Sequence, residues 1–225
     1  MKNERAIRNK LRSVDRLLEK EYGVPKRKRM DPLDELILTI LSQNTNDRNR
    51  DRAYAAMRNA YPTWRDVMNA PLARLQKVLK PGGLAKTKSR RIQKILRSIA
   101  KRGQVSLNYL QRLPTEDVER ELKSFEGVGP KTVCCVLLFA LGREAFPIDT
   151  HIFRVLGRLG VIPSRMTVAK AHEYVPQFVP EGRSHVLHLN IIAHGRTVCH
   201  PRNPACSNCI LKRHCDHYAA AITRS

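Results

Sequence analysis

Acidic residues, aromatic residues and long apolar runs are all scarce in this sequence of 225 residues. The longest apolar run extends only from Val133 to Leu141, far short of the ~20 residues that cross a bilayer. The first residues, 1–23, carry charges throughout and lack the apolar stretch of a signal peptide. We therefore expect a cytoplasmic protein that is neither secreted nor associated with a membrane.

The shortage of acidic residues leaves a large positive charge. The chain has 42 Lys and Arg against 20 Asp and Glu, a formal net charge of +22. Such an excess over a folded chain indicates a polyanionic partner. No basic stretch has an apolar face that is free to enter a lipid surface, which favours nucleic acid over a membrane.

No stretch alternates apolar and polar side chains for long enough to predict a β-strand, whereas helical periodicity is common. Asp31 is a suitable N-cap and Pro32 a suitable first residue for one helix. The apolar face of that helix comprises Leu33, Leu36, Ile37, Ile40 and Leu41. Weaker helical patterns cover residues 54–60, 71–80 and 88–101. The fold class is predicted to be all-α.

The most informative segment is a turn between two predicted helices, which contains Gly127, Val128, Gly129 and Pro130. Two glycines around one small apolar residue allow a tight turn whose N–H groups point outward at a helix N-terminus. That arrangement binds a phosphate without reading a base. The alternative is an ordinary helical hairpin with no ligand.

Lys131 is expected at the second position of the helix that follows this turn. The positive end of a helix disfavours another cation, so an amine held there beside DNA is a candidate nucleophile for a sugar carbon. Asp149 is expected to open the next helix. It either stabilises positive charge and moves protons or serves only as an N-cap.

Four of the six cysteines, namely Cys199, Cys206, Cys209 and Cys215, lie close together near the C-terminus. In a reducing compartment they are expected to bind metal rather than to form disulfides. Structural zinc sites usually contain two C-x2-C pairs. Only Cys206 and Cys209 are spaced in that way, so the pattern leans away from zinc and does not exclude it.

The segment from Gly127 to Lys131, followed by residues 148–155, resembles the helix-hairpin-helix DNA glycosylase superfamily. Together with the cysteine spacing, residues 31–215 resemble endonuclease III in particular. The resemblance implies that Lys131 attacks the sugar C1′ and expels the damaged base, with assistance from Asp149. It further implies that β-elimination from the resulting imine cuts the strand, and that the four cysteines hold a [4Fe–4S] cluster.

Two loops are expected to touch DNA, because a glycosylase must fill the gap left by an extruded nucleotide. By resemblance, residues 41–47 carry the polar side chain that replaces the lost base, and Leu84 enters from the other side. Asn44 stands where the family usually has glutamine, with Gln43 directly before it. The residue that fills the gap is therefore either Asn44 or Gln43, unless Asn44 is a helix C-cap.

Taken together, the sequence and its resemblance predict two helical lobes. Residues 27–143 are expected to form a helical barrel domain with the helix-hairpin-helix motif. Residues 1–26 and 144–225 are expected to form the iron–sulfur cluster domain. The expected protein is a monomeric, nucleoid-associated DNA glycosylase and abasic-site lyase that acts on oxidised or ring-saturated pyrimidines. A monofunctional mismatch glycosylase and a non-catalytic DNA-binding protein are the alternatives.

Overall fold

The computed structural model describes residues 2–223, and their side chains from residue 4 onward. Helices and short helical turns make up all the regular structure of this part of the chain. The predicted all-α class is therefore confirmed. No helix in these residues is long and apolar enough to cross a membrane. The chain divides into two compact units, residues 1–28 with 143–225 and residues 29–142, which are called unit 1 and unit 2 and are described separately.

Unit 2 consists of consecutive helices from the middle of the chain. They are α2 (Pro32–Ser42), α3 (Asp47–Ala60), α4 (Trp64–Asn69), α5 (Leu72–Leu79), η1 (Lys80–Gly82), α6 (Ala85–Ala100), η2 (Asn108–Arg112), α7 (Thr115–Lys123), α8 (Pro130–Cys135) and η3 (Val136–Leu141). The first of them, α2, packs against α3, α6, α8 and η3. It is therefore the central helix of this unit, which agrees with its predicted apolar face.

The local sequence explains how α2 begins. The Asp31 carboxylate accepts hydrogen bonds from the N–H groups of Leu33 (2.8 Å) and Asp34 (3.3 Å). Pro32 occupies the first helical position, where its missing N–H has no intrahelical partner in any case. The predicted cap and start of this helix are confirmed.

The apolar run after α8 does not continue as an α-helix. η3 has π-helical hydrogen bonding over Val136–Leu141 and ends at Gly142 in the left-handed region. Single π-turns are uncommon within helices and often lie near functional sites. In this chain the π-helical segment begins directly after α8, the helix that carries Lys131.

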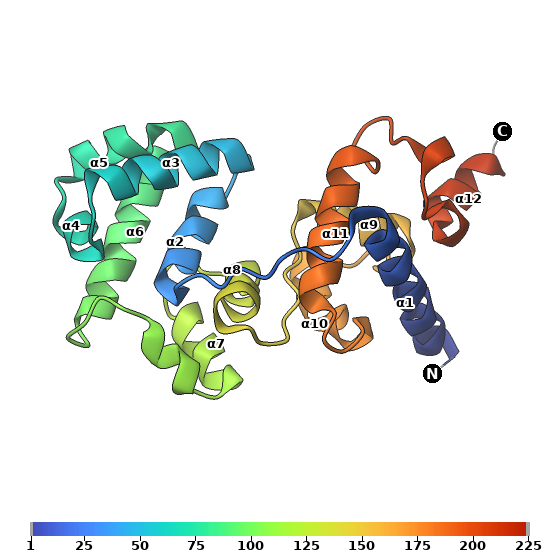
Figure 1. Cartoon of the computed structure of the whole chain (residues 1–225), viewed down its shortest axis with the longest axis horizontal. Coiled ribbons are helices and arrows are strands. Elements are labelled where there is room, and N and C mark those ends of the chain that lie inside the picture. Colours follow the sequence, from blue (N-terminus) through green and yellow to red (C-terminus); the bar gives the residue numbers. More distant parts are fainter. Residues whose placement is uncertain (1, 224–225) are drawn as a thin grey trace. The chain divides into compact units, whose positions relative to one another are not determined.

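Unit 1 combines an N-terminal helix with the last third of the chain. Its elements are α1 (Lys2–Tyr22), α9 (Thr150–Arg158), α10 (Val168–Tyr174), η4 (Pro176–Phe178), α11 (Ser184–Thr197), η5 (Cys206–Asn208), η6 (Lys212–His214) and α12 (Asp216–Ile222). The α11 helix packs against both α1 and α9 (Figure 1). Leu11, Leu18, Ile152 and Leu187 are fully buried between these helices.

An ion pair fastens the N-terminal helix to the C-terminal part of unit 1. Arg183, just before α11, donates to both carboxylate oxygens of Asp15 on α1, at 2.7 and 3.1 Å. It also contacts Glu19 one turn later. The Asp15 side chain is only 7% exposed, and charged pairs of this fork geometry are among the stronger polar contacts.

Candidate active site

A sharp turn over residues 124–129, called here the hairpin turn, joins α7 to α8. Gly127 has φ +77°, a conformation that glycine adopts with little strain. Val128 is buried and anchors the turn in the core. Gly129 is the N-cap of α8 and Pro130 its first residue. The helix-hairpin-helix geometry predicted from the sequence is confirmed, with N–H groups at the start of α8 of the kind that bind phosphate.

The hairpin turn is braced by Arg91 of α6. The Gln43 side chain donates from Nε2 to the Gly127 carbonyl oxygen (3.3 Å), and its Oε1 accepts from Arg91 Nη1 (2.6 Å). A Cβ added at Gly127 would lie 2.1 Å from Arg91 Nε. Glycine at this position therefore also provides the space that Arg91 occupies.

Two exposed residues of unit 2 have left-handed backbone conformations. Asn44 has φ +51° and Leu84 has φ +48°. This region is common for asparagine but strained for leucine. Leu84 is also 54% exposed, so its strain is not offset by burial of the side chain. Strained residues of this kind cluster at ligand-binding sites.

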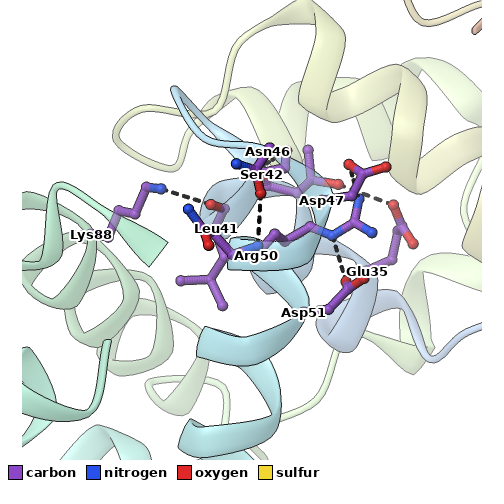
Figure 2. Close-up of polar contacts among 10 residues, drawn as sticks. Glu35, Leu41, Ser42, Asn46, Asp47, Arg50, Asp51 and Lys88 are labelled. Carbon is purple, nitrogen blue, oxygen red and sulfur yellow. Dashed lines mark hydrogen bonds and ion pairs between the residues drawn. The ribbon is translucent and has the colours of Figure 1, made fainter. Parts of the chain in front are cut away.

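One buried lysine connects the loops that carry these two residues. Lys88 Nζ donates to the carbonyl oxygens of Leu41 (2.7 Å) and Gly82 (2.8 Å), and the first of these bonds is drawn in Figure 2. The Lys88 side chain is 2% exposed, and burial lowers its pKa. The end of α2 and the 81–84 loop are thus fixed to one side chain.

Lys131 is the second residue of α8, and α8 packs against α2. Glu35, on α2, is 6% exposed. Burial raises the pKa of Glu35 to about 7, against the opposing effects of a hydrogen bond from Thr39 and the positive charges of Lys131 and Arg50. The candidate nucleophile is therefore close to a buried carboxyl group.

Arg50 belongs to a second set of charges at the same place. It donates to Asp47 at 3.0 Å and to Asp51 at 2.8 Å. Figure 2 shows its side chain reaching between these two carboxylates, with Glu35 nearby. The charge of Arg50 is thus shared among three carboxyl groups.

Sequence reasoning did not identify Glu35, Lys88 or Arg91. The signal for Glu35 was its spacing from Thr39, because two polar residues at i and i+4 lie on the same face of a mainly apolar helix. Lys88 and Arg91 carried no signal in the sequence. Their partners Leu41 and Gln43 precede them by 47 and 48 residues and belong to other elements.

Asp149 lies in unit 1 as the N-cap of α9. Its Oδ1 accepts a hydrogen bond from the Ile152 N–H at 2.7 Å. The capping interpretation of this residue is therefore confirmed. A capping carboxylate keeps a second oxygen, so the hydrogen bond is compatible with a further role.

The four C-terminal cysteines line one pocket of unit 1, together with Arg158, His194 and Leu211 among others. Burial raises the pKa of Cys209, and the charges of the other three thiols raise it further. Among the described residues, no group of three or more His, Cys, Asp or Glu side chains converges closely enough for one metal ion.

Arg158 holds the loop that carries these cysteines. It donates to the carbonyl oxygens of His200 (2.7 Å) and Pro201 (3.0 Å), and to the sulfur of Cys199 (3.2 Å). On another side, the buried His194 ring lies 3.5 Å from the Cys209 sulfur. Burial lowers the pKa of His194 to about 4. A neutral imidazole and an arginine thus both contact thiols of the pocket.

Residues 37–181 match the model of the HhH-GPD superfamily base excision DNA repair proteins. The chain belongs to this superfamily. The matched range contains the hairpin turn, Lys131 and Asp149.

Similar proteins agree with this assignment. Endonuclease III of Thermotoga maritima is 33% identical over 85% of this chain and 85% of its own length. An Arabidopsis thaliana protein whose name assigns it to the DNA glycosylases is 38% identical over 79% of this chain. The chain spans 58% of that plant protein. A solved endonuclease III–DNA complex superposes with a TM-score of 0.81 at 26% identity, covering 96% of this chain and 98% of the other.

Proposed function

We propose that this base excision repair DNA glycosylase is bifunctional, removing oxidised or ring-saturated pyrimidines from duplex DNA and then cutting the strand. The observation that carries the proposal is the position of Lys131 at the start of α8, directly after the hairpin turn. The similarity to endonuclease III over most of the chain supports it.

In the proposed reaction the Lys131 amine forms a bond to the sugar C1′ while the bond from C1′ to the base breaks. Loss of a proton and opening of the sugar ring give an imine between Lys131 and C1′. The imine withdraws electrons, so a base removes a C2′ proton and the 3′ phosphate leaves. Asp149 stabilises the positive charge that grows on the sugar while it continues to cap α9.

Besides Lys131, other residues of unit 2 position the DNA. The backbone of Gly127, Val128 and Gly129 holds a phosphate at the N-terminus of α8. Asn44 and Leu84 fill the space of the extruded nucleotide. Gln43 is the weaker candidate for this role, because its side chain is engaged by Arg91 and the hairpin turn.

Cys199, Cys206, Cys209 and Cys215 are the proposed ligands of a [4Fe–4S] cluster. The four thiols line one pocket, and four cysteine thiolates are the usual ligand set of such a cluster. When bound, the cluster supplies a rigid link that orders the loop. Arg158 orients the same loop through two of its carbonyl groups.

The nucleophile is tested by replacing Lys131 with glutamine. The variant should bind abasic duplex DNA but lose base excision and covalent trapping by borohydride, because only reduction of an imine joins the enzyme to the DNA. Lys123→Gln is the control, because Lys123 is an exposed residue of α7 paired with Glu119. Wild-type-like trapping by Lys131→Gln would refute the mechanism, and base excision without trapping by the wild type would indicate a monofunctional enzyme.

Asp149→Asn separates the two roles of that residue. Asparagine caps helices about as well as aspartate, so the variant should fold with unchanged stability. Its excision rate should nevertheless fall by at least about tenfold if the negative charge stabilises the transition state. Single-turnover excision and thermal unfolding on the same preparation measure both, and full activity would leave Asp149 as a cap alone.

A further inference from the structure

The buried lysine of α6 has unusual partners for a residue of its kind. Lysine is almost never fully buried in proteins unless its charge is paired. The partners of Lys88 are backbone carbonyl groups instead of carboxylates, namely those of Leu41 at the end of α2 and of Gly82 in the 81–84 loop. The cost of removing its ammonium group from water is therefore offset by hydrogen bonds to two separate elements.

The backbone of Lys88 makes a third contact with the same region. Its N–H donates to the carbonyl oxygen of Leu84 at 2.9 Å, and Leu84 is the N-cap of α6. The loop is also packed closely against α3, because a Cβ added at Gly82 would lie 2.9 Å from the Cβ of Ala53. One residue thus holds two carbonyl groups of the 81–84 loop and one of α2.

The carbonyl groups bound by the Lys88 side chain lie just before the two residues with strained backbones. Asn44, with φ +51°, follows Leu41 by three residues, and Leu84, with φ +48°, follows Gly82 by two. Such conformations persist only where the surrounding structure holds them. The hydrogen bonds of Lys88 provide this support for both loops from a single side chain.

We propose that Lys88 is a positioning residue for base extrusion, which fixes the loops of Asn44 and Leu84 to each other so that both side chains enter the duplex together. This inference rests on the proposed function, in which these two residues fill the space of the extruded nucleotide. Loops that moved independently would have to be ordered when DNA binds, and that ordering costs free energy. Loops fixed in advance leave more of the binding energy for unstacking the base.

The experiment replaces Lys88 with methionine, an unbranched side chain that donates no hydrogen bond. Two single-turnover rates are measured, namely excision of a ring-saturated thymine paired with adenine and nicking of the same duplex at a preformed abasic site. Their quotient, called here the extrusion ratio, should fall at least about tenfold, because misplacing a positioned group by about 1 Å can cost ~100-fold in rate. Partial unfolding lowers both rates in proportion and leaves the extrusion ratio unchanged.

Gln93 offers a matched control on the same helix. It is also buried, and its Nε2 donates to the carbonyl oxygens of Val67 (3.1 Å) and Ala70 (2.7 Å) at the end of α4. Gln93→Leu therefore removes two buried hydrogen bonds to another element, as Lys88→Met does, but none to the loops of Asn44 and Leu84. It should lower the melting temperature and keep the wild-type extrusion ratio.

A second variant serves where methionine leaves too little folded protein. Lys88→Gln keeps a donor at this position, but its side chain is one atom shorter and cannot hold both carbonyl groups. Its extrusion ratio should also fall. Leu84→Ala should then lower the ratio less in the Lys88→Gln background than in the wild type, because the leucine is already misplaced and the two effects are not additive.

The outcomes are distinct. An extrusion ratio that stays at the wild-type value in folded Lys88→Met or Lys88→Gln would overturn the positioning role and leave the proposed function intact. An equal fall in the ratio for Gln93→Leu would also overturn it, since the effect would then follow from lost stability. Failure of the wild type to excise the paired lesion or to nick the abasic site would overturn the proposed function and this inference with it.

Discussion

Replacing Glu35 by glutamine should change how the free energy of unfolding depends on pH. The folded protein holds the Glu35 proton up to about pH 7, whereas the ordinary pKa of this group is 4.5. Between these values the unfolded chain has lost the proton and the folded chain has kept it. The free energy of unfolding of the wild type therefore falls as pH rises through this window. Glutamine carries no proton to lose and removes this contribution.

The size of the effect follows from the difference between the two pKa values. At 1.36 kcal/mol per unit, the interval from 4.5 to about 7 corresponds to about 3 kcal/mol. Glu35→Gln should thus gain about 3 kcal/mol relative to the wild type between pH 4.5 and pH 8. The Thr39 hydroxyl still has an oxygen acceptor in the variant, so the hydrogen bond at position 35 is not lost.

The single tryptophan of the chain provides the assay. Trp64 belongs to unit 2, where its indole N–H donates to Asp34 at 3.0 Å, so its fluorescence reports the unfolding of the unit that contains Glu35. Urea titrations of both proteins at pH 4.5 and pH 8 give four free energies. The contributions of other titrating groups to the free energy of unfolding are the same in both proteins and cancel in the difference. A pH-independent difference, within about 1 kcal/mol, would show that Glu35 ionises normally in the folded state.

Two other predictions concern the loop and the cysteines. Asn44→Ala should slow excision of a paired, stacked lesion more than nicking at a preformed abasic site, because only the first substrate requires a base to be extruded. Asn44→Gln should restore or raise the excision rate. Equal losses by Asn44→Ala on both substrates would favour a purely structural role. Cys206→Ser should lower the iron content from roughly four atoms per chain and weaken folding of the cysteine loop. The control Cys134→Ser should do neither. A colourless, zinc-loaded and fully active wild type would contradict the proposed iron–sulfur cluster.

Much of the local structure could be predicted from the sequence, because it depends on neighbouring residues. The start of α2 is encoded by Asp31 and Pro32, and the hairpin turn by its two glycines. Helix starts without such signals were predicted less well. The structure begins α3 at Asp47 and not at residue 54, since Asn46 caps a first turn of charged and polar residues that lack apolar periodicity.

The α6 helix also begins earlier than expected, at Ala85 instead of Lys88. Leu84 precedes it in the left-handed region, and its carbonyl accepts from the Lys88 N–H. Leucine does not favour this conformation, so no propensity rule predicts a helix start there. The surroundings of Glu35 were equally hidden, because they depend on which faces of α2, α3 and α8 meet.

The backbone at Leu84 has a consequence for engineering. A left-handed leucine costs about 1–2 kcal/mol relative to glycine, and its exposed side chain recovers little of that. Selection of variants for thermostability alone should accept glycine at this position. Such variants would lose the one apolar side chain that this loop presents to solvent. If Leu84 has its proposed role in filling the space of the extruded nucleotide, stability screens of this chain need a parallel screen on damaged DNA, because stability alone would enrich proteins that lack this side chain.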